Sequence, residues 1–257
     1  MIKAAFFDVD GTLFSHTMHM VPESARKALH LLRENGIKVF LATGRGIKII
    51  KRVSWGDLEF DGYVTLNGQV CLDSEENILF EAPIKGEDAV YLIDAFQTRK
   101  MPLVIIEKDR TYINFINERV RQAQKAVSIP LLPTAEYKGA PIYQMIGYLN
   151  RQEAELLAEK IPNCKITRWY EEGIDIISKD GGKANGIQKI LDVYGIKREE
   201  IIAFGDGDND LDMLEFAGIG VAMGNAVKCV KEAADYVTSH IDEDGIWNAC
   251  RHFNLFE

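Results

Sequence analysis

Two carboxylates one residue apart follow a short apolar run near the start of the chain. Residues 4–7 are apolar, and Asp8 and Asp10 come next. Side chains at i and i+2 of a strand point the same way, so both can converge on one substrate atom. Because close carboxylates repel, a cation or a shared proton must relieve them. The pattern favours a divided chemistry: Asp8, kept anionic by a metal, attacks phosphorus, and Asp10 exchanges a proton with the leaving oxygen and with water. A strand ending in a plain Asp-Gly turn is the alternative interpretation.

Polar residues also follow two later apolar runs. Residues 37–42 are followed by Thr43, Gly44 and Arg45. A hydroxyl and free N–H groups at a strand end that leads into a helix can hold a phosphate oxygen, although Thr43 alone also fits a helix cap. Arg45 is either a substrate contact or a surface charge. Asn67, in an Asn-Gly hairpin signal, is either a substrate contact or a turn residue.

The densest acidic group follows the apolar run 201–204. Asp206, Asp208 and Asp210 alternate there with Gly207 and Asn209. An EF-hand is excluded because Leu211 stands where that loop requires glycine. The remaining interpretation is a site of oxygen ligands for a hard cation, for which Mg²⁺ is the natural candidate beside a phosphate.

Lys183 stands at the first turn of a predicted helix over residues 184–194. A cation is unfavourable there because of the helix dipole, so a functional role and a structural one are both open. A P-loop is excluded because Ile177 replaces its first glycine and Ala184 replaces its Ser or Thr.

The elements that must position these residues form two patterns. A helix over residues 22–35, opened by Pro22, separates the first two apolar runs, which predicts a parallel sheet with right-handed crossovers. Ligands of such sheets bind at the carboxyl ends of the strands. From about residue 83 short strands and helices suggest an α+β module with an antiparallel sheet. The predicted domains are a core of residues 1–83 and 181–257 and an insert of residues 84–180. The other predicted strands are 63–66, 70–72, 78–80, 103–106, 111–115, 142–149, 166–169, 174–177, 218–222 and 236–238, and the other helices start near residue 46 or span 88–98, 117–127, 152–160, 227–234 and 241–253.

Composition limits the classes of partner. The chain has 257 residues, 47% of them hydrophobic, and a net charge of −9 without a basic block, which argues against a nucleic-acid surface. The four cysteines form no Cys-x-x-Cys pair, so a zinc site or disulfide framework is not expected. No apolar run suggests a signal peptide or a membrane span. We therefore expect a cytoplasmic protein without membrane partners, either a monomer or a small homo-oligomer.

Four of these segments, in order, resemble the motifs of the haloacid dehalogenase superfamily: Asp-Val-Asp-Gly-Thr-Leu from residue 8, Thr43, Lys183 and Gly-Asp-Gly-Asp-Asn-Asp from residue 205. The resemblance implies a phosphatase that forms an aspartyl-phosphate on Asp8, with Asp10 as general acid and base. It implies phosphate binding by Thr43, Gly44, Lys183 and Asn209, Mg²⁺ binding by Asp8, the Asp10 backbone carbonyl and Asp206, and a supporting role for Asp210.

The insert and the carboxyl-terminal segments Ala-Met-Gly-Asn, Ala-Asp-Tyr-Val-Thr and Asp-Glu-Asp-Gly-Ile are similar to Cof-type phosphatases of that superfamily. This similarity implies an α/β fold: a Rossmann-like parallel sheet core with an inserted α+β cap that carries an antiparallel sheet. Arg168, Trp169, Tyr170 and Asp175 further resemble hexose-phosphate phosphatases, which makes Arg168 and Asp175 possible substrate contacts and a small phosphate ester the expected partner. A phosphomutase or phosphotransferase that uses the same intermediate is the alternative, and a phospho-accepting signalling domain is a more distant one.

Overall fold

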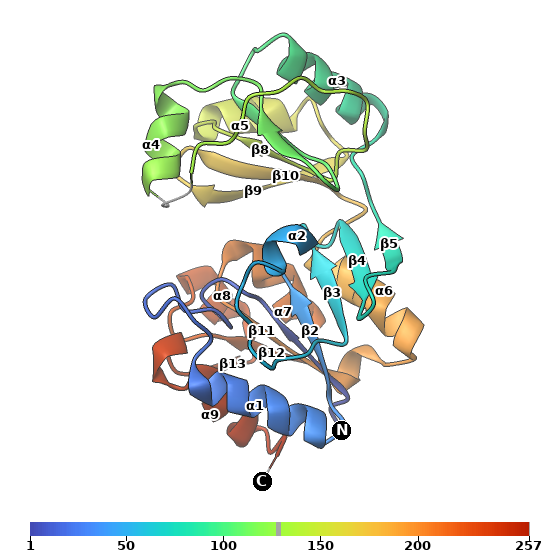
Figure 1. Cartoon of the computed structure of the whole chain (residues 1–257), viewed down its shortest axis with the longest axis vertical. Helices are drawn as coiled ribbons and strands as arrows, with labels where there is room; N and C mark the ends of the chain where they lie inside the picture. Colours follow the sequence, from blue (N-terminus) through green and yellow to red (C-terminus); the bar gives the residue numbers. More distant parts are fainter. Residues whose placement is uncertain (127–129, 257) are drawn as a thin grey trace. The chain divides into compact units, whose positions relative to one another are not determined.

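The computed structural model describes residues 1–126 and 130–256. The chain divides into two compact units (Figure 1): the first combines Met1–Glu81 with Gly181–Glu257, and the second is Ala82–Asp180. Each unit has its own sheet and its own hydrophobic clusters.

The first unit is built on an eight-stranded sheet in the order β13-β12-β11-β1-β2-β3-β4-β5. β1 (Ala4–Phe7) pairs in parallel with β2 (Lys38–Ala42) on one side and with β11 (Ile201–Gly205) on the other. The carboxyl ends of these three strands therefore lie side by side, as the sequence predicted. The other parallel strands are β3 (Gly62–Thr65), β12 (Ile219–Ala222) and β13 (Tyr236–Val237), and the antiparallel edge is β4 (Val70–Asp73) and β5 (Ile78–Glu81).

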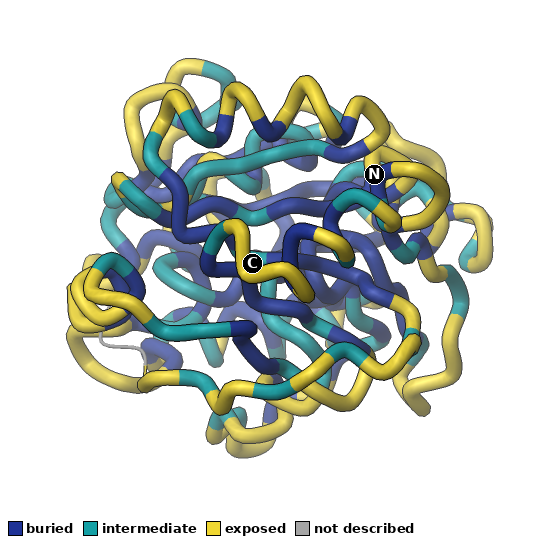
Figure 2. The backbone as a smooth tube through the Cα atoms, turned by 90° about the horizontal axis from the view of Figure 1, so that it is seen from above, coloured by how far each residue is buried: buried dark blue, intermediate teal, exposed yellow. Residues whose placement is uncertain are grey.

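Helices cover both faces of this sheet because alternate strand residues point to opposite sides. Phe7 belongs to the cluster formed with α1 (Glu23–Glu34) and α9 (Gly245–His252). Figure 2 shows buried segments in the interior of the chain and exposed segments on its outside. Phe6 belongs to the cluster formed with three further helices. Those helices are α6 (Lys183–Tyr194), α7 (Leu211–Phe216) and α8 (Lys228–Ala233).

The second unit has a five-stranded antiparallel sheet in the order β7-β6-β8-β10-β9. α3 (Gly86–Gln97) and α5 (Arg151–Ala158) share one hydrophobic cluster with the sheet. α4 (Glu118–Ala126) packs on the alternate strand residues Val104 and Ile113. The strands are β6 (Leu103–Ile106), β7 (Thr111–Ile113), β8 (Gln144–Gly147), β9 (Cys164–Tyr170) and β10 (Gly173–Ser178).

The α/β fold class predicted from the sequence is confirmed. Several elements differ from their predicted bounds by one to three residues, and three differences change the description of an element. The helix after Gly46 is one turn, α2 (Ile47–Ile50). Of the predicted strand 142–149, only the four residues of β8 form a strand. The last helix is preceded by a separate 3-10 turn, Ile241–Glu243, because Asp244 adopts a left-handed φ of 60° that interrupts the helix. Residue 127, predicted at the end of α4, lies outside the described residues.

All four cysteines are free thiols, three of them buried. Among residues 1–126 and 130–256, no helix combines the length and the apolar composition needed to cross a bilayer.

Candidate active site

Asp8 lies at the carboxyl end of β1, at the centre of the first unit's sheet. Its side chain is buried, with a residue exposure of 5%. The backbone N–H of Asp8 donates to the carbonyl of Phe204 at 2.9 Å, which extends the pairing of β1 with β11 by one residue. The ladder therefore fixes Asp8 next to the segment that follows β11.

Lys183 reaches Asp8 from the first turn of α6. Its Nζ donates to Asp8 Oδ1 at 2.6 Å and to Asp210 Oδ1 at 2.5 Å, and its side chain is fully buried. Burial lowers the pKa of Lys183, but the charges of Asp210 and Asp8 outweigh that effect and raise the pKa above its usual value. The unfavourable position at a helix N-terminus is thus balanced by two carboxylates.

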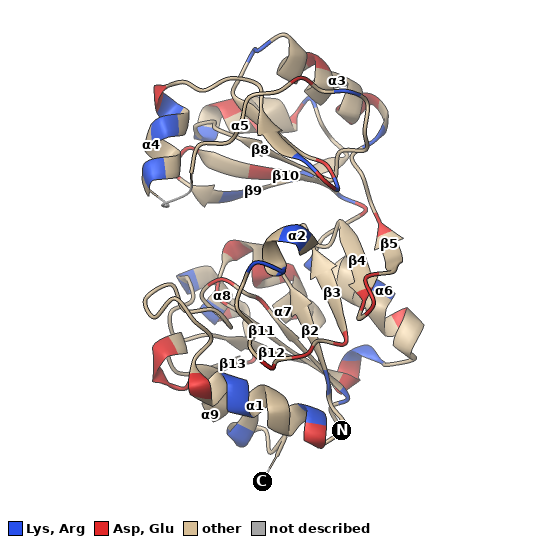
Figure 3. Ribbon diagram, viewed as in Figure 1, with Lys and Arg blue, Asp and Glu red and all other residues tan. Residues whose placement is uncertain are grey.

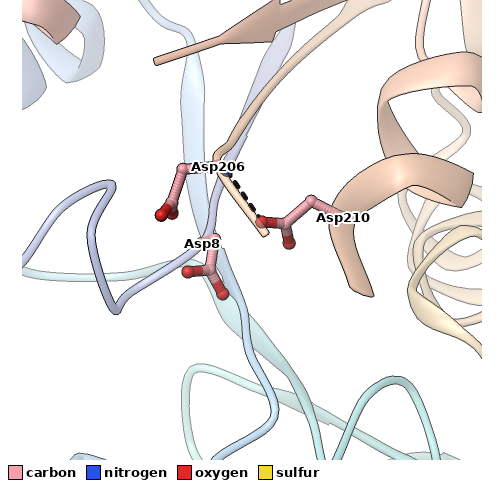
Figure 4. Close-up of side chains that lie close together, drawn as sticks. All are labelled: Asp8, Asp206 and Asp210. Atoms are coloured by element: carbon pink, nitrogen blue, oxygen red, sulfur yellow. Dashed lines mark hydrogen bonds between the residues drawn. The ribbon is translucent and has the colours of Figure 1, made fainter. Parts of the chain in front are cut away.

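Three carboxylates meet beside this lysine (Figure 4). Asp8, Asp206 and Asp210 each offer an oxygen atom, and these atoms lie within 4.8 Å of one another. Asp210 is oriented by the backbone N–H groups of Asp206 and Gly207, which both donate to its Oδ2 at 2.9 Å. The hydroxyl of Thr12 donates to Asp206 Oδ1 at 2.7 Å.

The charge balance of this cluster fits a divalent cation. Burial, first, and then the charge of Asp210 raise the pKa of Asp8 well above its ordinary value, against the lowering effect of Lys183. Burial and Asp210 likewise raise the pKa of Asp206 to about 7. The ammonium of Lys183 therefore leaves part of the negative charge of these carboxylates uncompensated. Carboxylate oxygens are also the ligands that hard cations prefer.

Asp10 has different partners. Its carboxylate receives Arg45 at both oxygens, from Nε at 2.7 Å and from Nη2 at 2.5 Å. His16 Nε2 lies 2.9 Å from Asp10 Oδ1, and the Asp10 side chain is 38% exposed. Arg45 therefore directly contacts Asp10, the residue predicted to act as general acid and base.

The predicted phosphate-binding residues gather at the ends of β2 and β11. Thr43 is buried, and its Oγ1 accepts the backbone N–H of Arg45 at 3.1 Å. Asn209 Nδ2 donates to Asn67 Oδ1 at 3.0 Å. A Cβ at Gly44 would lie 3.2 Å from that same Asn67 oxygen, so Gly44 and Asn67 are in close contact. The structure thus brings these four residues together within the first unit.

Arg168 and Asp175 lie in the second unit, on β9 and β10. Arg168 Nη1 donates to the backbone carbonyls of Leu149 at 3.0 Å and Glu171 at 2.6 Å, so it stabilises the chain around its own hairpin. Asp175 is half-buried and pairs across the ladder with Thr167.

Two further residues that touch this constellation were not predicted. Asn225 Nδ2 donates to the carbonyl of Gly11 at 2.7 Å, and its Oδ1 accepts the backbone N–H of Ile241 at 3.0 Å. Its position just after β12 could have indicated it, because several predicted site residues also lie just after a strand of this sheet. His16 had no such signal, because it approaches Asp10 through the loop after β1.

Comparisons with known proteins agree along the whole chain. Residues 5–250 match the family described as haloacid dehalogenase-like hydrolase. YkrA of Bacillus subtilis, a provisionally assigned phosphatase, is 32% identical over 258 residues, which cover 99% of either chain. BT1666 of Bacteroides thetaiotaomicron is described among phosphatases of the HAD superfamily. Its structure matches this one with a TM-score of 0.90 at 30% identity, and the match covers 100% of this chain and 96% of the BT1666 chain. BT4131, described as a subclass IIB sugar phosphatase, has a TM-score of 0.87 at 37% identity over 99% and 100% of the two chains.

Proposed function

This chain belongs to the haloacid dehalogenase-like hydrolase family, and from that premise we propose that it is a Mg²⁺-dependent phosphatase of small phosphate esters, sugar phosphates among them. The observation that carries the proposal is the buried Asp8 at the end of β1, in contact with Lys183 and beside Asp206 and Asp210. It is the arrangement expected of a carboxylate nucleophile whose charge must be balanced.

In the proposed reaction a carboxylate oxygen of Asp8 attacks phosphorus, and the bond from phosphorus to the leaving oxygen breaks. Asp10 gives its proton to the leaving oxygen, then takes one from water as the water oxygen attacks the aspartyl-phosphate and releases Asp8. Lys183, Thr43 with the N–H groups near Gly44, and Asn209 donate to the phosphoryl oxygens.

Asp8, Asp206 and the backbone carbonyl of Asp10 would hold the metal, with Asp210 as a supporting carboxylate that orients the loop. When bound, Mg²⁺ supplies positive charge for the phosphoryl group and keeps neighbouring carboxylates ionised.

The substrate class is supported by two observations. BT4131, a relative with a similar structure, is described as a sugar phosphatase. The stretch from Arg45 to Arg52, which includes Lys48 and Lys51, gathers basic residues around α2 in a chain of net charge −9 (Figure 3). We propose that this stretch receives the anionic ester and that the second unit acts as the cap that selects its organic part, with Arg168 and Asp175 as candidate contacts.

Asp8→Asn tests the nucleophile. Purified wild type is expected to release inorganic phosphate from sugar phosphates with Mg²⁺ present, and the variant is expected to lose at least about 10³-fold in kcat because an amide cannot form the intermediate. Asp208→Asn, an exposed carboxylate in the same loop as Asp206, is the matched control and should keep its activity. Phosphate release by Asp8→Asn at the wild-type rate would exclude the mechanism, and an isomerised sugar phosphate as product would favour a phosphomutase.

A further inference from the structure

Asn67 occupies a backbone position that few side chains adopt. It lies in the turn after β3 with a φ of 53°, and only 3% of its surface is exposed. Asparagine tolerates this left-handed conformation better than most residues. A turn alone, however, does not require a buried amide.

The side chain of Asn67 fixes the orientation of the Asn209 amide, that is, where its N–H end and its oxygen lie. Asn209 Nδ2 donates to Asn67 Oδ1 at 3.0 Å. The opposite end, Asn209 Oδ1, lies over Gly207, where a Cβ would come within 2.7 Å of it. An amide can present either a donor or an acceptor to a ligand, and only the N–H end can bind a phosphoryl oxygen.

The accessibility of the two amides differs. Asn67 is buried against Gly44, whereas Asn209 is only half-buried. A ligand at this edge of the sheet can therefore contact Asn209, while Asn67 lies behind it.

We propose that Asn67 is a positioning residue that acts through Asn209: it accepts one of the two Nδ2 hydrogens and so directs the second toward the phosphoryl group. The inference rests on the proposed function and assigns Asn67 a role in phosphate binding without substrate contact.

The backbone of Asn67 makes contacts that the test must preserve. Its N–H donates to the Thr43 carbonyl at 3.0 Å, and its carbonyl accepts the N–H of Gly182, next to Lys183, at 3.1 Å. Asn67→Gly keeps the backbone and the positive φ while removing the amide. Asn254→Gly is the matched control, because Asn254 is exposed near the carboxyl terminus and has a φ of 51°.

The experiment is a double-mutant cycle with Asn209→Ala, read out by kcat/KM and, separately, by the affinity for inorganic phosphate in calorimetry. Asn67→Gly is expected to lower both by about tenfold, and the double variant should match Asn209→Ala alone within about twofold. Asn254→Gly should leave both unchanged. Losses that multiply in the double variant, or wild-type phosphate affinity in Asn67→Gly, would overturn the inference.

Failure of the proposed function gives a different result. In that case the wild type would hydrolyse no phosphate ester. If it still binds inorganic phosphate, the affinity cycle decides the role of Asn67 separately, and if it binds none, the inference falls together with the proposed function. Thermal unfolding verifies that each variant is folded, and Asn67→Ser repeats the cycle if the glycine variant is not.

Discussion

The residues at the centre of the first unit carry more negative than positive charge. Asp8, Asp206 and Asp210 converge, and Lys183 is paired with two of them. Removing charges from water costs free energy unless partners compensate it, so this cluster is a place where the folded state carries a cost. The cost depends on pH, because protonation of a carboxylate removes it.

The pKa of Asp206 determines whether the free energy of unfolding rises or falls with pH. Its pKa is about 7 in the folded chain, against an ordinary value of 3.8, so between these values the folded state holds a proton that the unfolded state has released. The free energy of unfolding of the metal-free protein should therefore fall as pH rises from about 4 to about 7, by a few kcal/mol. Urea unfolding in EDTA at several pH values measures it.

Asp206→Asn is the control for that titration. Because its amide does not ionise, its stability relative to wild type should rise steadily across the same pH range, and added Mg²⁺ should reduce the difference by stabilising the wild type. A constant difference between the two proteins would contradict the assigned cause.

Four of the predicted residues share one signal, a polar side chain just after an apolar run. That rule found Asp8, Thr43, Asn67 and Asp206, because parallel strands end at a common edge. It could not find the contact of His16 with Asp10, which depends on the path of a loop and on side-chain rotamers. Nor could it separate contact with substrate from support, as Arg168 illustrates by bonding to backbone carbonyls.

At the scale of elements, the turn after β3 packs against the start of α6. Gly68 has a φ of 82°, and a Cβ there would lie 1.9 Å from the carbonyl oxygen of Gly182. The contact is with backbone, which cannot rotate away. The turn therefore fixes where α6 begins, and with it Lys183.

Gly68→Ala should consequently lower both stability and activity. We expect a loss of roughly 2 to 4 kcal/mol in the free energy of unfolding, from strain and from displacement of the α6 start, and a lower kcat at temperatures where the variant is folded. Chemical unfolding and phosphate release measure the two effects.

Gly36→Ala separates strain from contact. Gly36 has a similar φ of 75°, and a Cβ added there would meet no atom within 4 Å, so the substitution should cost about 1 kcal/mol and leave kcat unchanged. Equal effects of the two substitutions would show that the contact with Gly182 is unimportant.

The elements also show where apolar periodicity stops being informative. It located the strands and helices, but residues 142–149 form a ladder over Gln144–Gly147 only, because pairing depends on the neighbouring strands β6 and β10. The break before α9 depends on the left-handed φ of Asp244, which an Asp-Gly pair permits without requiring it.

At the scale of the whole molecule, the chain leaves and re-enters the first unit at neighbouring points. Glu81 pairs with Val70 at the end of β5, and Gly181 lies against the side chain of Gln69. The first unit also has hydrophobic clusters of its own on both faces of its sheet. From these features we expect it to fold without residues 82–180.

Replacing residues 82–180 by a short Gly-Ser linker tests this expectation. The shortened protein should unfold cooperatively, gain thermal stability from Mg²⁺, and hydrolyse small phosphate esters with less discrimination among them, because the proposed cap is absent. Thermal unfolding with and without Mg²⁺ and kcat/KM across a panel of esters provide the measurements. An unfolded product, or selectivity equal to that of the full chain, would count against the division of roles.

The adjacency of Glu81 and Gly181 also has an evolutionary consequence. Insertions, deletions or wholesale exchange of the intervening gene segment leave the register of all eight strands in the larger sheet untouched. If residues 82–180 select the substrate as proposed, exchange of that segment alone gives relatives that act on different esters with the same set of reacting residues.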